Sequence, residues 1–113
     1  MHELKIAEDL LAIVLDTASG NNLSRVTKVS IIFGELVQIV PDIFEFAFRE
    51  TVRSSIAEGA ELDIEITPVK MKCKNCGNIF QPKENLFACN SCSSADLEII
   101  QGKELFIKSI EGE

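Results

Sequence analysis

Four cysteines form two closely spaced pairs, and their spacing is the strongest chemical signal in the chain. Cys73 and Cys76 make one Cys-x-x-Cys knuckle, and Cys89 and Cys92 make a second one twelve residues further on. Two thiolates at this spacing can hold one ion from a tight turn, and two such turns complete a tetrahedral four-sulfur site. The pattern therefore predicts a structural Zn²⁺ site at Cys73, Cys76, Cys89 and Cys92.

Other uses of the four cysteines fit the sequence less well. A rubredoxin-like iron site shares the knuckle geometry, and thiolate softness does not distinguish iron from zinc. However, the chain has no Tyr or Trp that could form an aromatic cage around such a centre. A redox pair of the thioredoxin type needs only one Cys-x-x-Cys. Because four thiolates fill every position of a tetrahedral ion, no position remains for a catalytic water.

The amino terminus offers a second set of metal donors. His2 is the only histidine, and it stands between Met1 and Glu3. The amine of Met1, the amide nitrogen of His2 and its imidazole can close five- and six-membered chelate rings around Ni²⁺ or Cu²⁺, ions that favour planar nitrogen donors. The Glu3 carboxylate is an additional or alternative ligand. A surface histidine on a frayed terminus is the simpler interpretation, and the residues alone leave both open.

Composition limits the classes of partner. The chain has 113 residues and a formal net charge of −7, from 18 acidic and 11 basic side chains. Nucleic-acid-binding proteins normally present a basic face, so this balance argues against nucleic acid as a partner. We expect no signal peptide and no membrane segment, because charged residues interrupt every apolar run well before about 20 residues. These features predict a cytoplasmic protein, where cysteines stay reduced and metal ligation is favoured over disulfides.

Hydrophobic periodicity predicts two helices and three strands. Residues 3–18 carry apolar side chains at helical spacing, and Pro41-Asp42 opens a second helix that Glu58-Gly59 closes. In the second helix Phe44 and Phe48 lie on the buried stripe with Ile56, whereas Phe46 lies off it and is the better candidate for a partner contact. The predicted strands are Arg25–Phe33, Glu61–Thr67 and Lys103–Ile110.

Pro68 marks a change of character along the chain. Residues 70–101 are polar and hold all four cysteines, so we expect metal to hold this segment folded. The strand that follows is more apolar than a cysteine module needs and is expected to return to the first sheet. The predicted fold is α+β: two helices on a small three-stranded sheet with an inserted zinc-ribbon-like module. The predicted parts are a nickel-binding domain at 1–68, the zinc module at 69–101 and a returning strand at 102–113.

The whole chain resembles the HypA family of nickel metallochaperones. The resemblance is carried by Met1-His2-Glu3 ahead of a helix, by the two cysteine knuckles, and by four other stretches. These four stretches are Ile32-Phe33-Gly34-Glu35-Leu36, Phe44-Glu45-Phe46-Ala47-Phe48, Glu58-Gly59-Ala60-Glu61-Leu62 and Gly102-Lys103-Glu104-Leu105. The chain departs from the family in the second knuckle, where Asn90 and Ser93 stand at positions that are Pro and Gly in many members. This departure removes no ligand.

The resemblance implies a carrier and not an enzyme. It implies transient Ni²⁺ at His2 with Glu3 and Met1, structural Zn²⁺ at the four cysteines, and nickel delivery during maturation of [NiFe]-hydrogenase. It also implies a HypB-type GTPase and the hydrogenase large subunit as partners, with urease maturation proteins as further clients. The oligomeric state is open between monomer and homodimer. The alternative from a different class is a zinc-ribbon adaptor that binds nucleic acid or protein without transferring nickel.

Overall fold

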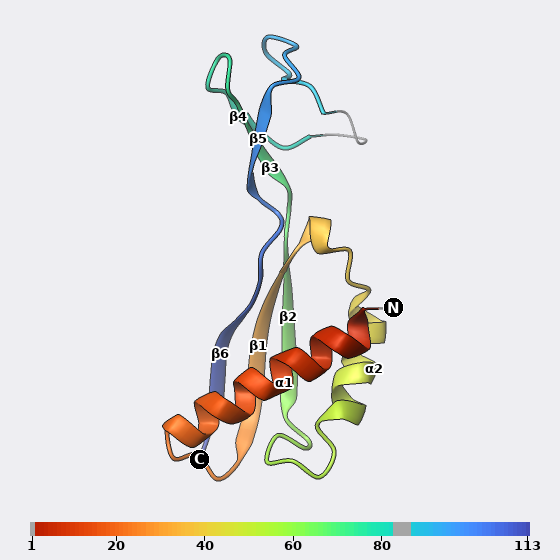
Figure 1. Cartoon of the computed structure of the whole chain (residues 1–113), viewed down its shortest axis with the longest axis vertical. Helices are drawn as coiled ribbons and strands as arrows, with labels where there is room; N and C mark the ends of the chain where they lie inside the picture. The colour runs from red at the N-terminus through yellow and green to blue at the C-terminus, as the bar shows by residue number, and fades with distance from the viewer. Residues whose placement is uncertain (1, 83–86) are drawn as a thin grey trace. The chain divides into compact units, whose positions relative to one another are not determined.

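A computed structural model describes residues 2–82 and 87–113, and it has the predicted α+β architecture (Figure 1). Within these described residues, two α-helices, one 3₁₀ turn and six strands follow one another. In order they are α1 (Glu3–Gly20), β1 (Val26–Gly34), η1 (Glu35–Val37), α2 (Pro41–Thr51), β2 (Glu61–Thr67), β3 (Lys70–Cys73), β4 (Ile79–Phe80), β5 (Leu97–Gln101) and β6 (Leu105–Gly112).

The strands form two three-stranded sheets. The first has the order β2-β1-β6, so the predicted return of the last strand to the first sheet is confirmed. Arg25 and Glu113 exchange backbone hydrogen bonds of 3.1 and 2.9 Å, which makes β6 antiparallel to β1. The second sheet has the order β4-β3-β5 and is antiparallel throughout, with Met71 opposite both Phe80 and Ile99.

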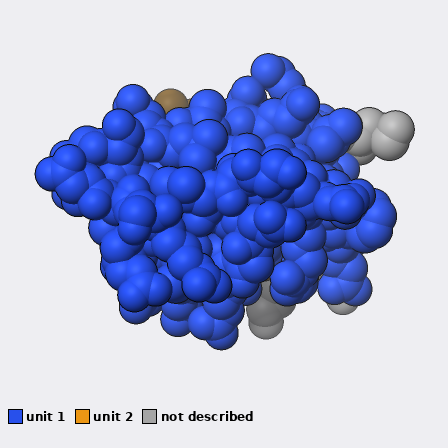
Figure 2. Space-filling view, turned by 90° about the horizontal axis from the view of Figure 1, so that it is seen from below, with its two compact units in different colours: residues 1–32, 39–65, 105–113 blue, residues 33–38, 66–104 orange. Residues whose placement is uncertain are grey.

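The chain divides into two compact units. The first comprises residues 1–32, 39–65 and 105–113, and the second comprises residues 33–38 and 66–104 (Figure 2, blue and orange). In the first unit α1 packs against α2 and β6, and it buries Ala7, Leu10, Val14 and Ala18. The second unit has its own small core of Val69, Met71, Cys73, Phe80 and Cys89, against which Leu97 and Ile99 pack.

Helix α2 is shorter than predicted. It ends at Thr51, so Ile56 lies beyond it and is 37% exposed instead of continuing the buried stripe. Two serines explain the early end. Ser54 has a left-handed backbone with φ of 66°, and the Ser55 hydroxyl donates to the Val52 carbonyl at 2.6 Å. Serine side chains that bond to nearby backbone compete with helix continuation.

Apolar periodicity predicts that Leu4, in the helix expected at residues 3–18, and Ile66, in the strand expected at Glu61–Thr67, face the core, but both are exposed. Leu4 of α1 is 54% exposed, and Ile66 of β2 is 44% exposed. In the first turn of α1, Glu3 and not Leu4 occupies the position that faces the core, and Glu3 is only 6% exposed. Phe44 and Phe48 are buried as predicted, with ring centroids 5.8 Å apart, and Phe46 is 70% exposed.

In the second unit, two carboxylates connect chain segments that are distant in sequence. The Glu104 carboxylate accepts the Gly102 N–H at 2.7 Å and the hydroxyl of Thr67, and the Glu35 carboxylate accepts the Val69 N–H at 3.2 Å. The hydroxyl of Thr67, followed by the backbone N–H of Gly102, lowers the pKa of the Glu104 carboxyl. The ionised form of Glu104 therefore stabilises the fold.

This lowered pKa predicts that Glu104 contributes less to stability in acid. A carboxyl whose pKa is depressed in the folded protein stabilises the fold above its ordinary pKa, and this contribution disappears as the pH falls through the folded pKa. We expect Glu104→Gln to be less stable than the wild type in urea at pH 7, and the gap to shrink below about pH 4. The matched control is Glu98→Gln on β5, where the side chain is exposed. A gap that stays constant with pH would contradict this role.

Candidate metal centres

The two cysteine knuckles have the same backbone conformation. In the first, the Cys73 N–H donates to the Asn78 carbonyl at 2.8 Å, and the Gly77 N–H donates to the Cys73 carbonyl at 2.8 Å. The second knuckle repeats both bonds sixteen residues later, from the Cys89 N–H to the Ser94 carbonyl at 2.8 Å and from the Ser93 N–H to the Cys89 carbonyl at 2.9 Å.

The residue after each knuckle turns the chain. Gly77 has φ of 79° and Ser93 has φ of 65°, so both lie in the left-handed region that suits glycine and costs other residues about 1 kcal/mol. A small residue after the second cysteine lets the chain bend in this way, and the sequence has a glycine at one position and a serine at the other. Ser93 keeps the bend of Gly77 even though it carries a side chain.

The four sulfurs lie at the spacing that a tetrahedral ion requires. The Cys73 and Cys92 Sγ atoms are 3.5 Å apart, the Cys76 and Cys89 Sγ atoms are 3.6 Å apart, and all four lie within 4.8 Å of one another. A zinc ion with Zn–S bonds of about 2.3 Å needs sulfurs about 3.8 Å apart. The donor set and its geometry therefore fit a structural zinc ion with no position left for water.

Hydrogen bonds lower the pKa of two of the four cysteines. The Cys92 N–H and then the Ser91 N–H, each 3.4 Å from the Cys89 sulfur, lower the pKa of Cys89 to about 6. The side-chain amide of Asn75, 3.6 Å from the Cys92 sulfur, lowers the pKa of Cys92. These donors prepare thiolates, which are the form that binds metal.

The Cys76 sulfur shows why the cluster needs a cation. The backbone N–H of Asn78 favours the Cys76 thiolate, but the Cys89 sulfur, burial and the other two sulfurs together outweigh it and raise the pKa of Cys76 to about 12. Four thiolates at this spacing repel one another. A divalent ion placed among them would remove that repulsion.

The asparagine amides near the sulfurs are functional side chains that the spacing argument missed. The Asn78 amide lies 3.8 Å from the Cys89 sulfur and donates to the Asn90 side-chain oxygen at 2.6 Å, so it joins the two knuckles. Asn75 reaches across to Cys92 in the same way. The only signal in the sequence is that Asn75 and Asn90 stand inside the knuckles and that Asn78 follows the first knuckle after one residue. Turn propensity also explains asparagine at these positions.

The amino terminus presents its donors at the start of α1. His2 is exposed and is the N-cap residue, and its carbonyl accepts the Ile6 N–H at 2.8 Å. Helix geometry leaves the first N–H groups of α1 without intrahelical acceptors, so metal binding there would break no helical hydrogen bond. The Glu3 carboxylate is buried and accepts the Val40 N–H at 3.4 Å. The predicted donor Met1 lies outside the described residues.

Comparison with known proteins decides the family. The family model described as hydrogenase/urease nickel incorporation, metallochaperone, hypA matches residues 1–112. The chain belongs to the HypA family. It is 39% identical to the hydrogenase maturation factor HypA of Aquifex aeolicus, with 98% of this chain and 96% of that protein covered. It is 39% identical to the factor of the same name from Crocosphaera subtropica, with 100% and 96% covered.

Solved HypA structures share the fold along the whole chain. The solution structure of the Ni metallochaperone HypA from Helicobacter pylori superposes with a TM-score of 0.73 at 29% identity, covering 99% of this chain and 97% of that one. A second structure, described as the HypA protein, gives a TM-score of 0.77 at 29% identity. The predicted family and fold class are confirmed. HypA proteins are metallochaperones for hydrogenase maturation and not enzymes, which confirms the predicted class of function.

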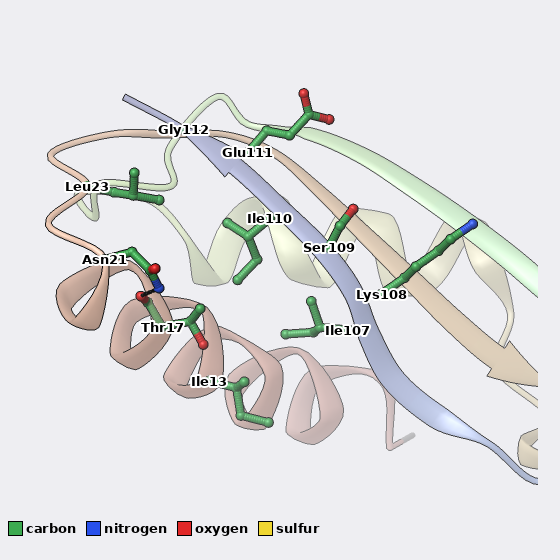
Figure 3. A pocket seen from close by; sticks show the side chains of 10 residues that line it. All are labelled: Ile13, Thr17, Asn21, Leu23, Ile107, Lys108, Ser109, Ile110, Glu111 and Gly112. Carbon is green, nitrogen blue, oxygen red and sulfur yellow. Dashed lines mark hydrogen bonds between the residues drawn. The ribbon is translucent and has the colours of Figure 1, made fainter.

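A cavity in the first unit has none of the candidate metal donors of this HypA chain in its lining. It has a volume of about 610 Å³ and is lined by residues of α1 and β6, and Ile107 and Ile110 point from β6 toward α1 (Figure 3). The charged side chains of Lys108 and Glu111 point away from α1. Its lining contains no cysteine and no histidine.

The described residues contain one possible multidentate metal cluster, the four cysteines. Neither helix in residues 2–82 and 87–113 is long and apolar enough to cross a membrane. Within the part of the chain that the structure describes, the four cysteines are therefore the one cluster of this kind, and turns of the second unit build it.

Proposed function

We propose that this HypA chain binds Ni²⁺ at its amino terminus through Met1, His2 and Glu3 and delivers it for maturation of [NiFe]-hydrogenase. The nickel-binding part is residues 1–68 together with the strand in 102–113. In residues 69–101, Cys73, Cys76, Cys89 and Cys92 hold a structural zinc ion. The observation that carries the proposal is that His2 is exposed at the start of α1, where the first backbone N–H groups donate no hydrogen bond within the helix.

The two proposed sites divide the work of a carrier. Four thiolates in a closed tetrahedral site hold zinc tightly and suit a structural ion. Nitrogen and carboxylate donors at the start of a helix make a more open site that can release its ion to a client. Selectivity for nickel follows from the planar arrangement of nitrogen donors that Ni²⁺ favours.

The proposed partners follow from this role. A HypB-type GTPase supplies or regulates nickel, and the hydrogenase large subunit receives it, with urease maturation proteins as further clients. These exchanges take place in the cytoplasm, where the cysteines stay reduced. The family membership supports contact with the maturation machinery.

The test is nickel titration of untagged, zinc-loaded protein, comparing the wild type with His2→Ala. We expect one zinc per chain in both proteins and nickel affinity at least about 100-fold lower in the variant, which corresponds to about 2.7 kcal/mol. Calorimetry measures nickel affinity and elemental analysis measures zinc. An Asp16→Ala variant, changed at an exposed carboxylate of α1, is the matched control and should bind nickel as the wild type does.

Unchanged nickel affinity in His2→Ala would contradict the proposed nickel-carrier function. If His2→Ala binds nickel as tightly as the wild type, the amino terminus is not the site. A zinc-ribbon adaptor would then be the better account, and binding to nucleic acid or to other proteins would be measured next.

A further inference from the structure

An exposed apolar surface lies at the amino-terminal end of α1. Leu4 is 54% exposed, Ile43 is 54% exposed and Phe46 is 70% exposed. They line one hollow of about 490 Å³ together with Ala47, Glu3 and Glu50. Single exposed apolar residues are ordinary, but three large ones around one hollow indicate a contact surface. We call these six residues the helix-pair surface.

The surface is built by the outward faces of two packed helices. Ile43, Phe46, Ala47 and Glu50 recur at helical spacing on α2, opposite the buried Phe44 and Phe48. Leu4 comes from α1, which packs against α2. A hollow between two helices suits a third helix whose apolar side chains enter it, as in helix-in-groove recognition. No strand contributes to the lining, so strand addition does not fit.

Charge selects the kind of helix that fits. The two charged side chains of the lining are carboxylates, the exposed Glu50 and the largely buried Glu3. Glu50 has an ion pair with Arg53 at 3.4 Å, but both side chains are more than half exposed, and such pairs contribute little. The whole chain carries a net charge of −7. A second copy would bring carboxylates against carboxylates, whereas a helix with lysines or arginines beside its apolar stripe would be attracted.

We infer that the helix-pair surface, which is apolar and acidic, binds a basic amphipathic helix. This helix belongs to the protein that exchanges nickel with this chain. The inference rests on the proposed function, because Glu3 belongs both to the surface and to the proposed nickel donors. A partner helix held here places its own metal ligands next to His2. Docking and ion transfer are then coupled by position.

Two designed peptides test the chemistry of the partner. Each is an amphipathic helix of about 18 residues with leucines at i, i+3, i+4 and i+7; one carries lysines at the other positions and the second carries glutamates. We expect the lysine peptide to bind zinc-loaded protein at least tenfold more tightly than the glutamate peptide at 0.15 M salt. In amide NMR spectra the shifts should concentrate on Leu4, Ile43 and Phe46.

Matched variants locate the binding site. Ile43→Ser and Phe46→Ser should each weaken the lysine peptide at least tenfold, and Ile13→Ser should leave it unchanged. Ile13 is the control because it is 52% exposed in the same unit but lines the cavity beside β6. The substituted side chains are exposed, so circular dichroism should show the same helix content in all three.

Several outcomes would overturn the inference. They are equal binding of both peptides, no binding of either, peptide binding that Ile13→Ser weakens, or self-association of the wild type that Phe46→Ser abolishes. Binding of the protein to phosphatidylglycerol vesicles through Phe46 would assign the surface to a membrane instead. Nickel titration of the same variants keeps the two proposals separate, because Ile43→Ser should bind nickel normally whether or not the peptide binds.

Discussion

Replacing Cys89 with serine is expected to abolish zinc binding and to unfold the sheet formed by β3, β4 and β5. Cys89 is 3% exposed, belongs to the small core of its unit, and accepts N–H groups from Ser91 and Cys92. A serine hydroxyl remains protonated at neutral pH and is a poor zinc ligand. Zinc binding contributes about 10–16 kcal/mol in zinc-finger peptides, more than the stability of many small domains, so the loss should be severe.

Elemental analysis and amide NMR check this result. Cys89→Ser should contain less than a tenth of the zinc of the wild type, and the β3 and β5 amides should lose their dispersion. Chelation of the wild type should reproduce the same spectrum. Ser91→Ala is the matched control, because it keeps the backbone N–H that reaches the Cys89 sulfur. A Cys89→Ser protein that retains one zinc and a folded sheet would show that the centre does not require the Cys89 thiolate.

Local patterns in the sequence predicted the parts of the fold that depend on near neighbours. The Cys-x-x-Cys spacing sets a turn within six residues, and both knuckles have it. Helix α1 and strand β2 follow from apolar periodicity, and β2 has the predicted bounds Glu61–Thr67. The end of α2 was harder, because Ser54 and Ser55 stop the helix although apolar residues at the right spacing continue to Ile56.

Contacts between distant segments could not be predicted in the same way. The strand order β2-β1-β6 depends on pairing across more than seventy residues, for which periodicity gives no register. The bond between Glu35 and Val69, and that between Thr67 and Glu104, join residues 34 and 37 positions apart. Nor could the sequence show that Glu3 turns inward to the Val40 N–H while Leu4 faces outward, because both fit the first turn of a helix.

Gly34 shows how such a distant contact determines residue choice. Its N–H donates to the Glu104 carbonyl at 2.7 Å, and the Leu36 N–H donates to the Gly102 carbonyl at 2.7 Å. A Cβ atom on Gly34 would lie 2.1 Å from the carbonyl carbon and oxygen of Gly102. Both clashing atoms are backbone, so no side-chain rotation can relieve the overlap. The absence of a side chain at this position is what allows the two backbones to approach.

Gly34→Ala is therefore expected to destabilise the protein by about 3 kcal/mol or more, at the upper end of the range for overpacking. Urea unfolding of the zinc-loaded protein measures the change in free energy. Gly20→Ala is the matched control: a Cβ there meets nothing within 4 Å, and in a helix alanine is favoured over glycine by up to about 1 kcal/mol. We expect the two glycine-to-alanine changes to act in opposite directions. If Gly34→Ala were as stable as the wild type, the close approach of Gly34 and Gly102 would not be required by the fold.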